Sequence, residues 1–307
     1  MKKLKTPLRY PGGKSRAIKK LAPGLPEKFT DFREPFLGGG SMAIHITKEY
    51  PDASVWVNDA YYNLYNFWVQ LRDNGQALYD ELMRIKTPIG YVSKPLRKKK
   101  VPKIDWDPSI LNKIDEHRQL FNHAKCNIGT QSTDKLTKAV YFFILNKCSF
   151  SGLGESSSFS EQASEQNFSM NSINNLLGYS KLIKNWKITN LDYADVMNAP
   201  GDDCFVFLDP PYDIKDDLYG KNGDMHSGFD HMRFYEDVVQ CPHAWMITYN
   251  SNEVLKKRFS DYHFNDWDLT YTMRSSKVYT EAQKDRKELL ITNYERNVSN
   301  GSNGILL

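Results

Sequence analysis

The strongest chemical signal in the sequence is the tetrapeptide Asp209-Pro210-Pro211-Tyr212. An apolar segment of strand length, residues 204–208, precedes it directly, so the tetrapeptide is expected at the carboxyl end of a buried strand. Ligands of open α/β sheets bind at that end of the strands. The two prolines disfavour both helix and sheet pairing because each lacks a backbone N–H. The motif is therefore predicted to form a rigid turn that offers a carboxylate, carbonyl oxygens and an aromatic ring.

These groups suit the recognition of an exocyclic amino group on a nucleic-acid base. The Asp209 carboxylate and the Pro210 carbonyl are both acceptors, so together they can take the two amino hydrogens. That pairing would draw the nitrogen toward sp³ geometry and free its lone pair for attack on a methyl donor, while Tyr212 stacks on the base. An ordinary turn explains Asp-Pro alone. The full tetrapeptide behind an apolar strand favours the chemical interpretation.

A second motif is rich in glycine and is typical of a turn from a strand into a helix. Gly38, Gly40 and Ala43 satisfy G-x-G-x-x-A, and Ser41 is predicted to cap the apolar helix that follows. Residues 54–57 are predicted to form the next strand. Asp59 then lies at the offset of about 20 residues expected of an acid on a ribose hydroxyl pair. This half-domain predicts an adenosine-containing cofactor without distinguishing NAD from another one.

The amino-terminal segment resembles a phosphate-binding loop but lacks one required glycine. Gly13-Lys14-Ser15 supplies G-K-S, yet Leu8 occupies the position of the first glycine, and no strand precedes it. We therefore reject a phosphate-binding loop. The glycines still predict a close backbone approach, with Tyr10 and Lys14 directed at whatever binds there.

The charge of the chain is concentrated in two basic clusters. The net charge of the 307 residues is only +4, but Lys and Arg gather in residues 2–20 and 94–103. Such clusters suit contacts with phosphate groups. The four cysteines show no C-x-x-C spacing, which predicts neither a metal site nor disulfides and favours a cytoplasmic location. We expect neither a signal peptide nor a membrane segment, because no apolar run approaches ~20 residues.

Hydrophobic periodicity and turn residues predict alternating strands and helices. The predicted helices span 16–21, 61–71 continuing to 85, 109–122, 133–147, 172–183, 232–239 and 252–258, and further strands span 186–189, 244–249, 269–272 and 288–294. The Lys-rich loop 94–103, the Ser-rich run 156–169 and the loop 213–230 are expected to lack regular structure, and the run to be mobile by composition.

Taken together and in their order, these motifs resemble the Dam-type (D12 class, α group) DNA adenine-N6 methyltransferases. The resemblance covers roughly residues 8–294. It rests on Tyr10-Pro11-Gly12-Gly13-Lys14, Glu34-Pro35-Phe36-Leu37-Gly38-Gly39-Gly40-Ser41, Asn58-Asp59, Leu145-Asn146-Lys147, Phe150-Ser151-Gly152-Leu153, Asp192-Tyr193, Asp209-Pro210-Pro211-Tyr212, Arg274-Ser275 and Glu288-Leu289-Leu290-Ile291-Thr292-Asn293-Tyr294.

The resemblance implies an α/β fold, namely a Rossmann-like S-adenosylmethionine-dependent methyltransferase sheet with an inserted, mainly helical target-recognition domain. Residues 1–60 and 185–296 would form the catalytic domain, 61–184 the insertion and 297–307 a flexible tail. The implied reaction transfers a methyl group to N6 of an adenine flipped out of double-stranded DNA, with no metal. A monomer on DNA is one open arrangement.

The resemblance also assigns candidate residues. The implied catalytic residues are Asp209, Pro210, Pro211 and Tyr212. The implied cofactor-binding residues are Tyr10, Lys14, Phe36, Gly38, Gly40, Ser41, Asp59, Asp192, Tyr193 and Asp209. The implied DNA-binding residues are Arg9, Lys14, Lys98, Lys99, Phe150, Ser151, Leu153, Glu155 and Arg274. Phe150 matches an aromatic side chain that inserts into the duplex, and Ser151 and Leu153 match base-reading positions.

One residue departs from the pattern of GATC-specific members. These carry Arg two residues after the matching Leu, whereas this chain has Glu155. Arg reads guanine in the major groove, while Glu accepts a hydrogen bond from cytosine N4. The departure argues against GATC as the target.

Three alternatives remain open from the sequence. An NAD(P)-dependent oxidoreductase would explain the glycine turn and Asp59 but leaves the tetrapeptide 209–212 and both basic clusters unused. A non-catalytic DNA-binding module would need no donor pocket. Within the methyltransferases, cytosine-N4 or RNA-adenine methylation is the nearer rival.

Overall fold

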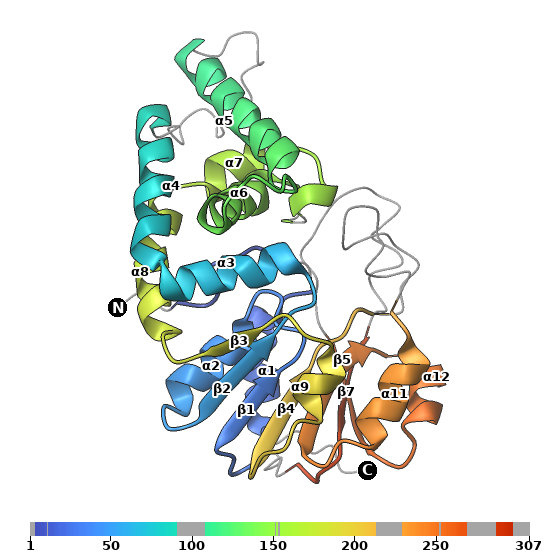
Figure 1. The fold of residues 1–307 in the computed structure, drawn as a ribbon. Helices are drawn as coiled ribbons and strands as arrows, with labels where there is room; N and C mark the ends of the chain where they lie inside the picture. Colours follow the sequence, from blue (N-terminus) through green and yellow to red (C-terminus); the bar gives the residue numbers. More distant parts are fainter. Residues whose placement is uncertain are drawn as a thin grey trace.

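Seven strands form one sheet in the order β3-β2-β1-β4-β5-β7-β6 (Figure 1). The computed structural model describes residues 4–10, 12–90, 108–150, 152, 154–212, 229–251, 253–268 and 287–296. The strands are β1 (Asp31–Glu34), β2 (Ser54–Asn58), β3 (Lys187–Thr189), β4 (Cys204–Leu208), β5 (Ala244–Asn250), β6 (His263–Asp268) and β7 (Lys287–Thr292).

The direction of the strands creates a switch point in the middle of the sheet. β3, β2, β1, β4 and β5 pair in parallel, whereas β7 pairs antiparallel with both β5 and β6. The chain leaves β1 toward β2 on one side and returns through β4 on the other. Open α/β sheets bind ligands at the carboxyl ends of strands beside such a reversal. The ends of β1 and β4 are therefore the expected site.

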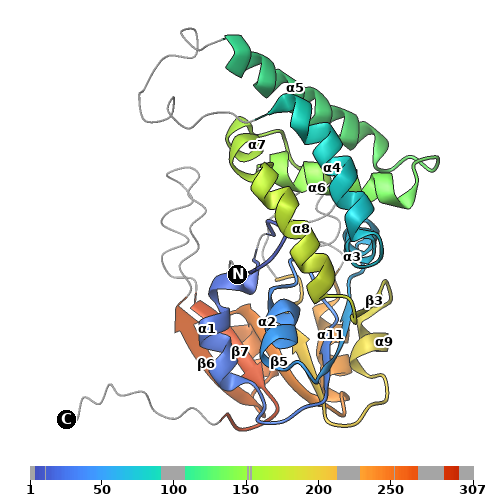
Figure 2. The ribbon, with the colours of Figure 1, turned by 90° about the vertical axis from the view of Figure 1, so that its left-hand side faces the viewer.

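Alternating side chains of the sheet build two hydrophobic cores. Phe205 and Phe207 of β4 join one core, and Val206 and Leu208 join the other. Helices α1 (Ile18–Leu21) and α2 (Ser41–Glu49) cover the first face (Figure 2). Helices α9 (Tyr193–Met197), α11 (His231–Val239) and α12 (Glu253–Arg258) cover the second. Burial on both faces explains why β4 is an unbroken apolar run.

Between β2 and β3, the described residues form six further α-helices. Figure 1 shows α3 crossing beside the sheet, with the others stacked beyond it. They are α3 (Tyr62–Asp73), α4 (Gly75–Ile89), α5 (Pro108–Asn127), α6 (Lys135–Cys148), α7 (Glu161–Asn167) and α8 (Met170–Leu182). The first core runs without interruption from the sheet into these helices. The predicted domain boundaries at 60/61 and 184/185 stay a prediction.

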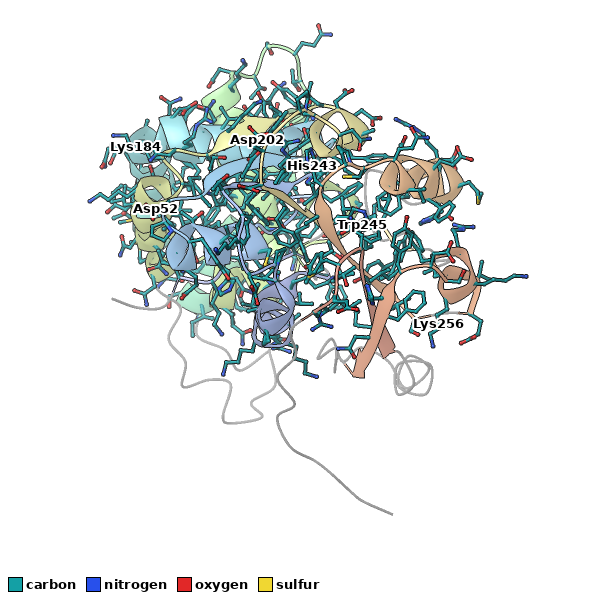
Figure 3. All side chains as sticks on the ribbon, turned by 90° about the horizontal axis from the view of Figure 1, so that it is seen from below. Asp52, Lys184, Asp202, His243, Trp245 and Lys256 are labelled. Atoms are coloured by element: carbon teal, nitrogen blue, oxygen red, sulfur yellow. The ribbon has the colours of Figure 1, made fainter. Side chains whose placement is uncertain are left out.

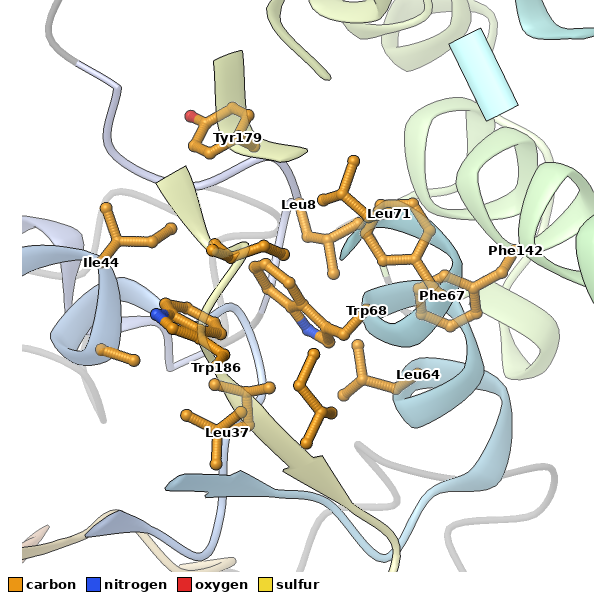
Figure 4. Close-up of a cluster of buried hydrophobic side chains, with 14 of the residues drawn as sticks. Leu8, Leu37, Ile44, Leu64, Phe67, Trp68, Leu71, Phe142, Tyr179 and Trp186 are labelled. Atoms are coloured by element: carbon orange, nitrogen blue, oxygen red, sulfur yellow. The ribbon is translucent and has the colours of Figure 1, made fainter. Parts of the chain in front are cut away.

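Trp68 of α3 lies at the junction between the helices and the sheet. Its ring centroid is 5.6 Å from that of Trp186, and both rings are buried among Leu37, Ile44 and Leu64 (Figure 4). The Trp68 indole Nε1 also donates a hydrogen bond of 3.2 Å to the Gly38 carbonyl. This contact fixes the helical part against the glycine turn.

The Ser-rich run is not a featureless loop, so that prediction is wrong. It contains helix α7, whose cap residue Ser160 accepts a hydrogen bond from the Ala163 N–H at 3.2 Å. Phe159 bridges to Ser149, and Phe168 is fully buried. Serine-rich composition concealed this structure because serine favours helix caps as well as loops.

The predicted cap of α2 is also wrong. The residue that precedes this helix is Gly40, whose φ of 64° is left-handed, and Ser41 is the first helical residue without a capping side chain. The Oε2 of Glu34 instead accepts a hydrogen bond of 2.8 Å from the Ala43 N–H. A carboxylate from β1 therefore satisfies the helix terminus that a local cap normally serves.

Several predicted segments lie outside the described residues. They are the strand 269–272, the loop 94–103, residues 213–228 and the tail 297–307. Strand β6, by contrast, was not predicted. Its sequence is mostly polar because it is the edge strand of the sheet, where Phe264 is 40% exposed.

The amino ends of the strands form the opposite end of the sheet. Figure 3 views this end from below, with Asp52 before β2, Asp202 before β4 and His243 before β5 labelled. Asp52 and Asp202 are exposed. They are useful controls for carboxylates at the other end of the same two strands. None of the helices in the described residues is long and apolar enough to cross a membrane.

Lys86 and His117 form a buried polar pair in the helical part. Lys86 Nζ lies 2.8 Å from His117 Nε2. Burial lowers the pKa of Lys86 from 10.5 to about 8 and that of His117 to about 3. The folded-state pKa of Lys86 is below its unfolded value, so this lysine destabilises the fold most when it is charged. The contribution of Lys86 to the free energy of unfolding therefore rises as the pH increases from about 8 to 10.5.

We expect Lys86→Met to be more stable than the wild type near about pH 7, because it removes a buried ammonium. The difference should shrink near about pH 10, where the wild-type lysine is neutral when folded. Urea unfolding at both pH values measures this change. Lys184→Met, at an exposed position (Figure 3), is the control. A stability difference that does not change with pH would contradict the account.

Candidate active site

The carboxyl ends of β1, β2 and β3 are joined by one buried side chain. Asn58 Nδ2 donates to the carbonyls of Pro35 at 3.2 Å and Leu191 at 3.1 Å. Its Oδ1 accepts from the Leu191 N–H at 2.8 Å. The Asn58 carbonyl in turn accepts from the Leu37 N–H at 2.9 Å. These bonds hold the loops that follow three strands in one place.

The glycine turn requires its glycines for two reasons. Gly38 and Gly40 have φ of 48° and 64°, in the left-handed region that other residues avoid. A Cβ on Gly38 would lie 2.9 Å from the Tyr10 ring, and one on Gly40 would lie 2.8 Å from the Trp68 ring. Tyr10 therefore packs against the turn, and its role in ligand binding stays a prediction.

Asp59 lies directly beside the glycine turn, although 21 residues separate it from Gly38 in the chain. Its Oδ2 accepts from the Gly38 N–H at 2.9 Å, and its Oδ1 accepts from the Tyr61 N–H at 3.0 Å. Burial raises the pKa of Asp59 to about 6. Each carboxylate oxygen has a second lone pair, so both can still accept a hydroxyl hydrogen.

Glu34 is a buried acid that sequence reasoning did not assign to the site. Burial raises the pKa of Glu34 well above its usual range. The hydrogen bond from the Ala43 N–H lowers this pKa, whereas the negative charges of Asp209 and Asp59 raise it further. Glu34 thus lies within electrostatic reach of both predicted site carboxylates. The strand that carries it, Asp31–Glu34, is mostly charged, so the available signal was the position of Glu34 directly before the glycine motif. Ser41, a predicted cofactor residue, pairs through its hydroxyl with Ser15 at 2.8 Å.

Lys14 brings the amino-terminal segment to the tetrapeptide after β4. Its ammonium Nζ lies 2.7 Å from Asp209 Oδ1, 2.6 Å from the Tyr212 hydroxyl and 3.0 Å from the Gly12 carbonyl. The Lys14 side chain is only 3% exposed. An ammonium group has three protons. Each of them has an acceptor here.

Thr248 of β5 completes the surroundings of one Asp209 oxygen. Its hydroxyl donates to Asp209 Oδ1 at 2.8 Å, the same oxygen that accepts from Lys14. Among the described residues, no donor is paired with Asp209 Oδ2. The Asp209 side chain is 21% exposed, so a ligand can reach this carboxylate. Pro210 is buried beside it.

Tyr212 is held from two sides. Its ring stacks on Tyr249, with centroids 5.7 Å apart and planes 28° apart. Its hydroxyl donates to Glu288 Oε2 at 2.9 Å. Sequence reasoning missed Thr248, Tyr249 and Glu288, because they contact the tetrapeptide only through the pairing of β4, β5 and β7.

Aromatic rings line the adjacent side of the sheet. Phe36 stacks on Tyr193, with centroids 5.3 Å apart, and Phe229 packs against both. The Tyr193 hydroxyl donates to Asp237 at 2.7 Å. Asp192 Oδ1 caps α9 by accepting from the Ala194 N–H at 2.9 Å, and it also pairs with Arg233. The predicted residues Phe36, Asp192 and Tyr193 therefore lie together.

The structure describes some of the predicted DNA-binding residues and not others. The Arg9 guanidinium donates to the Ser149 carbonyl at 2.8 Å, and Phe150 is 51% exposed. Glu155 Oε1 accepts from Asn63 Nδ2 at 2.6 Å and from the Tyr61 hydroxyl. Five predicted positions lie outside the described residues, namely Lys98, Lys99, Ser151, Leu153 and Arg274.

Asn146 of α6 connects the amino-terminal segment at Arg9 with Gly152. Its Oδ1 accepts from the Arg9 N–H at 3.0 Å, and its Nδ2 donates to the carbonyls of Arg9 at 2.7 Å and Gly152 at 3.0 Å. The carboxyl end of α6 therefore fastens Gly152 to the segment that also carries Tyr10 and Lys14. In the described part of the chain, no three His, Cys, Asp or Glu side chains gather in a way that could hold a metal.

Comparison with known proteins agrees with this arrangement. The family model for D12 class N6 adenine-specific DNA methyltransferases matches residues 10–273. The chain is 24% identical over 214 residues to the type II methyltransferase M.MjaIII of Methanocaldococcus jannaschii, covering 67% of this chain and 68% of that protein. It is 19% identical over 309 residues to the type II methyltransferase M1.LlaDCHI of Lactococcus lactis subsp. cremoris, covering 93% and 94%.

The family match extends from Tyr10, which packs on the glycine turn, past Asp209 and Tyr212 beyond the end of β4. It thus includes the glycine turn, the tetrapeptide and the helices between them. The sheet order, with an antiparallel β7 between β5 and β6, fits the same class. The chain belongs to the D12 class of N6 adenine-specific DNA methyltransferases.

Proposed function

We propose that this methyltransferase transfers a methyl group from S-adenosylmethionine to N6 of an adenine flipped out of double-stranded DNA, with Asp209-Pro210-Pro211-Tyr212 as the catalytic turn. The observation that carries the proposal is the hydrogen bonding of the two oxygens of the Asp209 carboxylate. Lys14 and Thr248 occupy one oxygen, and the other remains to accept a hydrogen from the target amine.

The residues around the glycine turn fit the donor. Asp59 would accept the ribose hydroxyls with its remaining lone pairs. The stacked Phe36 and Tyr193 offer an aromatic surface for the adenine ring of the donor. Gly38 and Gly40 allow close backbone approach. When bound, S-adenosylmethionine supplies an activated methyl group on a positively charged sulfur.

The chemical task of the protein is to align and polarise the target nitrogen. Asp209 Oδ2 and the Pro210 carbonyl would each accept one N6 hydrogen, which localises the lone pair toward the methyl carbon. As the new N–C bond forms, the bond between the methyl carbon and sulfur would break and leave neutral S-adenosylhomocysteine. The Asp209 carboxylate would stabilise the positive charge that develops on N6 until one of its protons is lost to solvent. Lys14 fixes the orientation of this carboxylate. Most of the rate enhancement should thus come from positioning and electrostatics.

The target adenine is inaccessible inside a duplex, so it must leave the stack at a cost of a few kcal/mol. Tyr249 packs against the Tyr212 ring and supports it, and we assign stacking of the flipped base to this ring. We assign to the exposed Phe150 the role of filling the space that the base leaves. Arg9, Lys98, Lys99 and Arg274 would contact DNA, with Ser151, Leu153 and Glu155 as base-reading residues.

Because both named relatives are type II methyltransferases, we further propose that the enzyme modifies a defined site as the companion of a restriction endonuclease. A reducing cytoplasm and a monomer on DNA fit this role. DNA affinity should fall steeply with salt, as expected for phosphate contacts.

We expect Asp209→Asn to lower the methylation rate by about 100-fold or more, because its amide presents a donor where the amine needs an acceptor. Tritium transfer from labelled S-adenosylmethionine to DNA measures the rate. Asp202→Asn, at the exposed opposite end of β4 (Figure 3), should retain full activity. Full turnover by Asp209→Asn would remove this residue from the chemistry.

We expect Asp59→Ala to weaken binding of S-adenosylmethionine by about 10- to 100-fold through the loss of charged hydrogen bonds. Calorimetry measures the dissociation constant, and Asp52→Ala, before the amino end of β2 (Figure 3), is the matched control. Wild-type affinity should fall as the pH is lowered through about 6, where Asp59 gains a proton and loses an acceptor. An unchanged constant in Asp59→Ala would count against the ribose assignment.

We expect Glu155→Arg to change the methylated sequence, because it exchanges an acceptor for a donor at a base-reading position. Single-molecule sequencing of plasmid DNA methylated by each variant gives the sequence. Glu155→Gln, which keeps an acceptor for Tyr61 and Asn63, separates base choice from loss of those contacts. An identical site for wild type and Glu155→Arg would exclude Glu155 from recognition.

A further inference from the structure

Strand β7 contains a buried acid to which the mechanism above gives no task. Glu288 is 1% exposed and is followed by the apolar residues Leu289, Leu290 and Ile291. A buried carboxylate is costly unless hydrogen bonds compensate it. Its Oε2 accepts a bond of 2.9 Å from the hydroxyl of Tyr212.

The chemistry of the neighbours sets the direction of the hydrogen bonds at this hydroxyl. Lys14 Nζ lies 2.6 Å from the Tyr212 oxygen, and an ammonium group can only donate. The tyrosine oxygen therefore accepts from Lys14, and its single proton goes to Glu288. Asp209, Lys14, Tyr212 and Glu288 thus form one connected chain of hydrogen bonds.

Two neighbouring strands anchor the two ends of the catalytic turn. Thr248 of β5 donates to Asp209 at the first residue of the turn, and Glu288 of β7 accepts from Tyr212 at the last. Both anchors are buried, and β5 pairs with β7 so that Asn250 faces Glu288. The turn is therefore clamped from the sheet at both ends, with Lys14 joining them.

We propose that Glu288 is a positioning residue for methyl transfer, which holds the Tyr212 ring at the angle at which the flipped adenine stacks. This rests on the functions proposed above for Tyr212 and Asp209. Tyr249 supports one face of the ring, and the bond to Glu288 fixes the hydroxyl end. Together they set where the adenine lies and hence where N6 meets Asp209. A displacement of about 1 Å at such a site lowers a rate by about 100-fold.

The test compares Glu288→Leu, Glu288→Gln and Tyr212→Phe in single-turnover methylation of a short duplex, built on the site that single-molecule sequencing of plasmid DNA methylated by the wild type identifies. Glu288→Leu and Tyr212→Phe should each lower the rate by about 10-fold or more, because either change breaks the bond to a charged group. Glu288→Gln should recover most of the rate, because its amide oxygen still accepts the tyrosine proton. Donor affinity should remain at the wild-type value in all three.

A double-mutant cycle distinguishes positioning through Tyr212 from general support of the fold. In the Tyr212→Phe background, Glu288→Leu should lower the rate by no more than about twofold, because the bond is already absent. With 2-aminopurine at the target position, Glu288→Leu and Tyr212→Phe should change the emission of the flipped base alike. Glu295→Gln, an exposed glutamate just after β7, should match the wild type in every assay.

Three results would overturn the proposal. One is an equal rate loss for Glu288→Leu in the Tyr212 and Tyr212→Phe backgrounds. Another is a wild-type rate for Tyr212→Phe, which decides the matter even where Glu288→Leu does not fold. The third is a Glu288→Gln enzyme no more active than a folded Glu288→Leu. Failure of the underlying catalytic assignment is separate, because it would appear as retained turnover in Asp209→Asn.

Discussion

The site depends on the burial of one ammonium group at the switch point of the sheet. Removing a lysine charge from water is costly unless its protons find acceptors. Lys14 meets this condition with a backbone carbonyl, Asp209 and the hydroxyl of Tyr212. The ion pair therefore constrains a segment near the amino terminus to lie over the end of β4, some 195 residues later in the chain.

That constraint brings three parts of the structure together. The segment that carries Lys14 also places Tyr10 against the glycine turn and Arg9 against the Ser149 carbonyl at the end of α6. Asn146 closes the same junction from α6. The roles proposed above in donor binding, base handling and DNA reading thus fall on one short stretch of chain. Such preorganisation is what a reaction governed by alignment and electrostatics requires.

Local patterns predicted the elements that carry strong periodic or turn signals. The buried strand before Asp209 and the offset of Asp59 from the glycines needed no tertiary information. The helix within the Ser-rich run was missed because serine favours loops as well as helix caps. The cap of α2 by Glu34 was missed because it depends on a partner supplied by another element, β1. Thr248 and Glu288 were missed for the same reason, since strand pairing alone brings them to the catalytic turn.

The geometry of the bound target adenine tests the account most directly. A crystal structure of the protein with duplex DNA and an unreactive analogue of the donor would locate N6 relative to the turn. The account predicts N6 within hydrogen-bond distance of Asp209 Oδ2 and the Pro210 carbonyl, with the base on the Tyr212 ring and the analogue beside Gly38 and Asp59. An adenine bound away from Asp209, or a donor analogue bound away from the glycine turn, would contradict it.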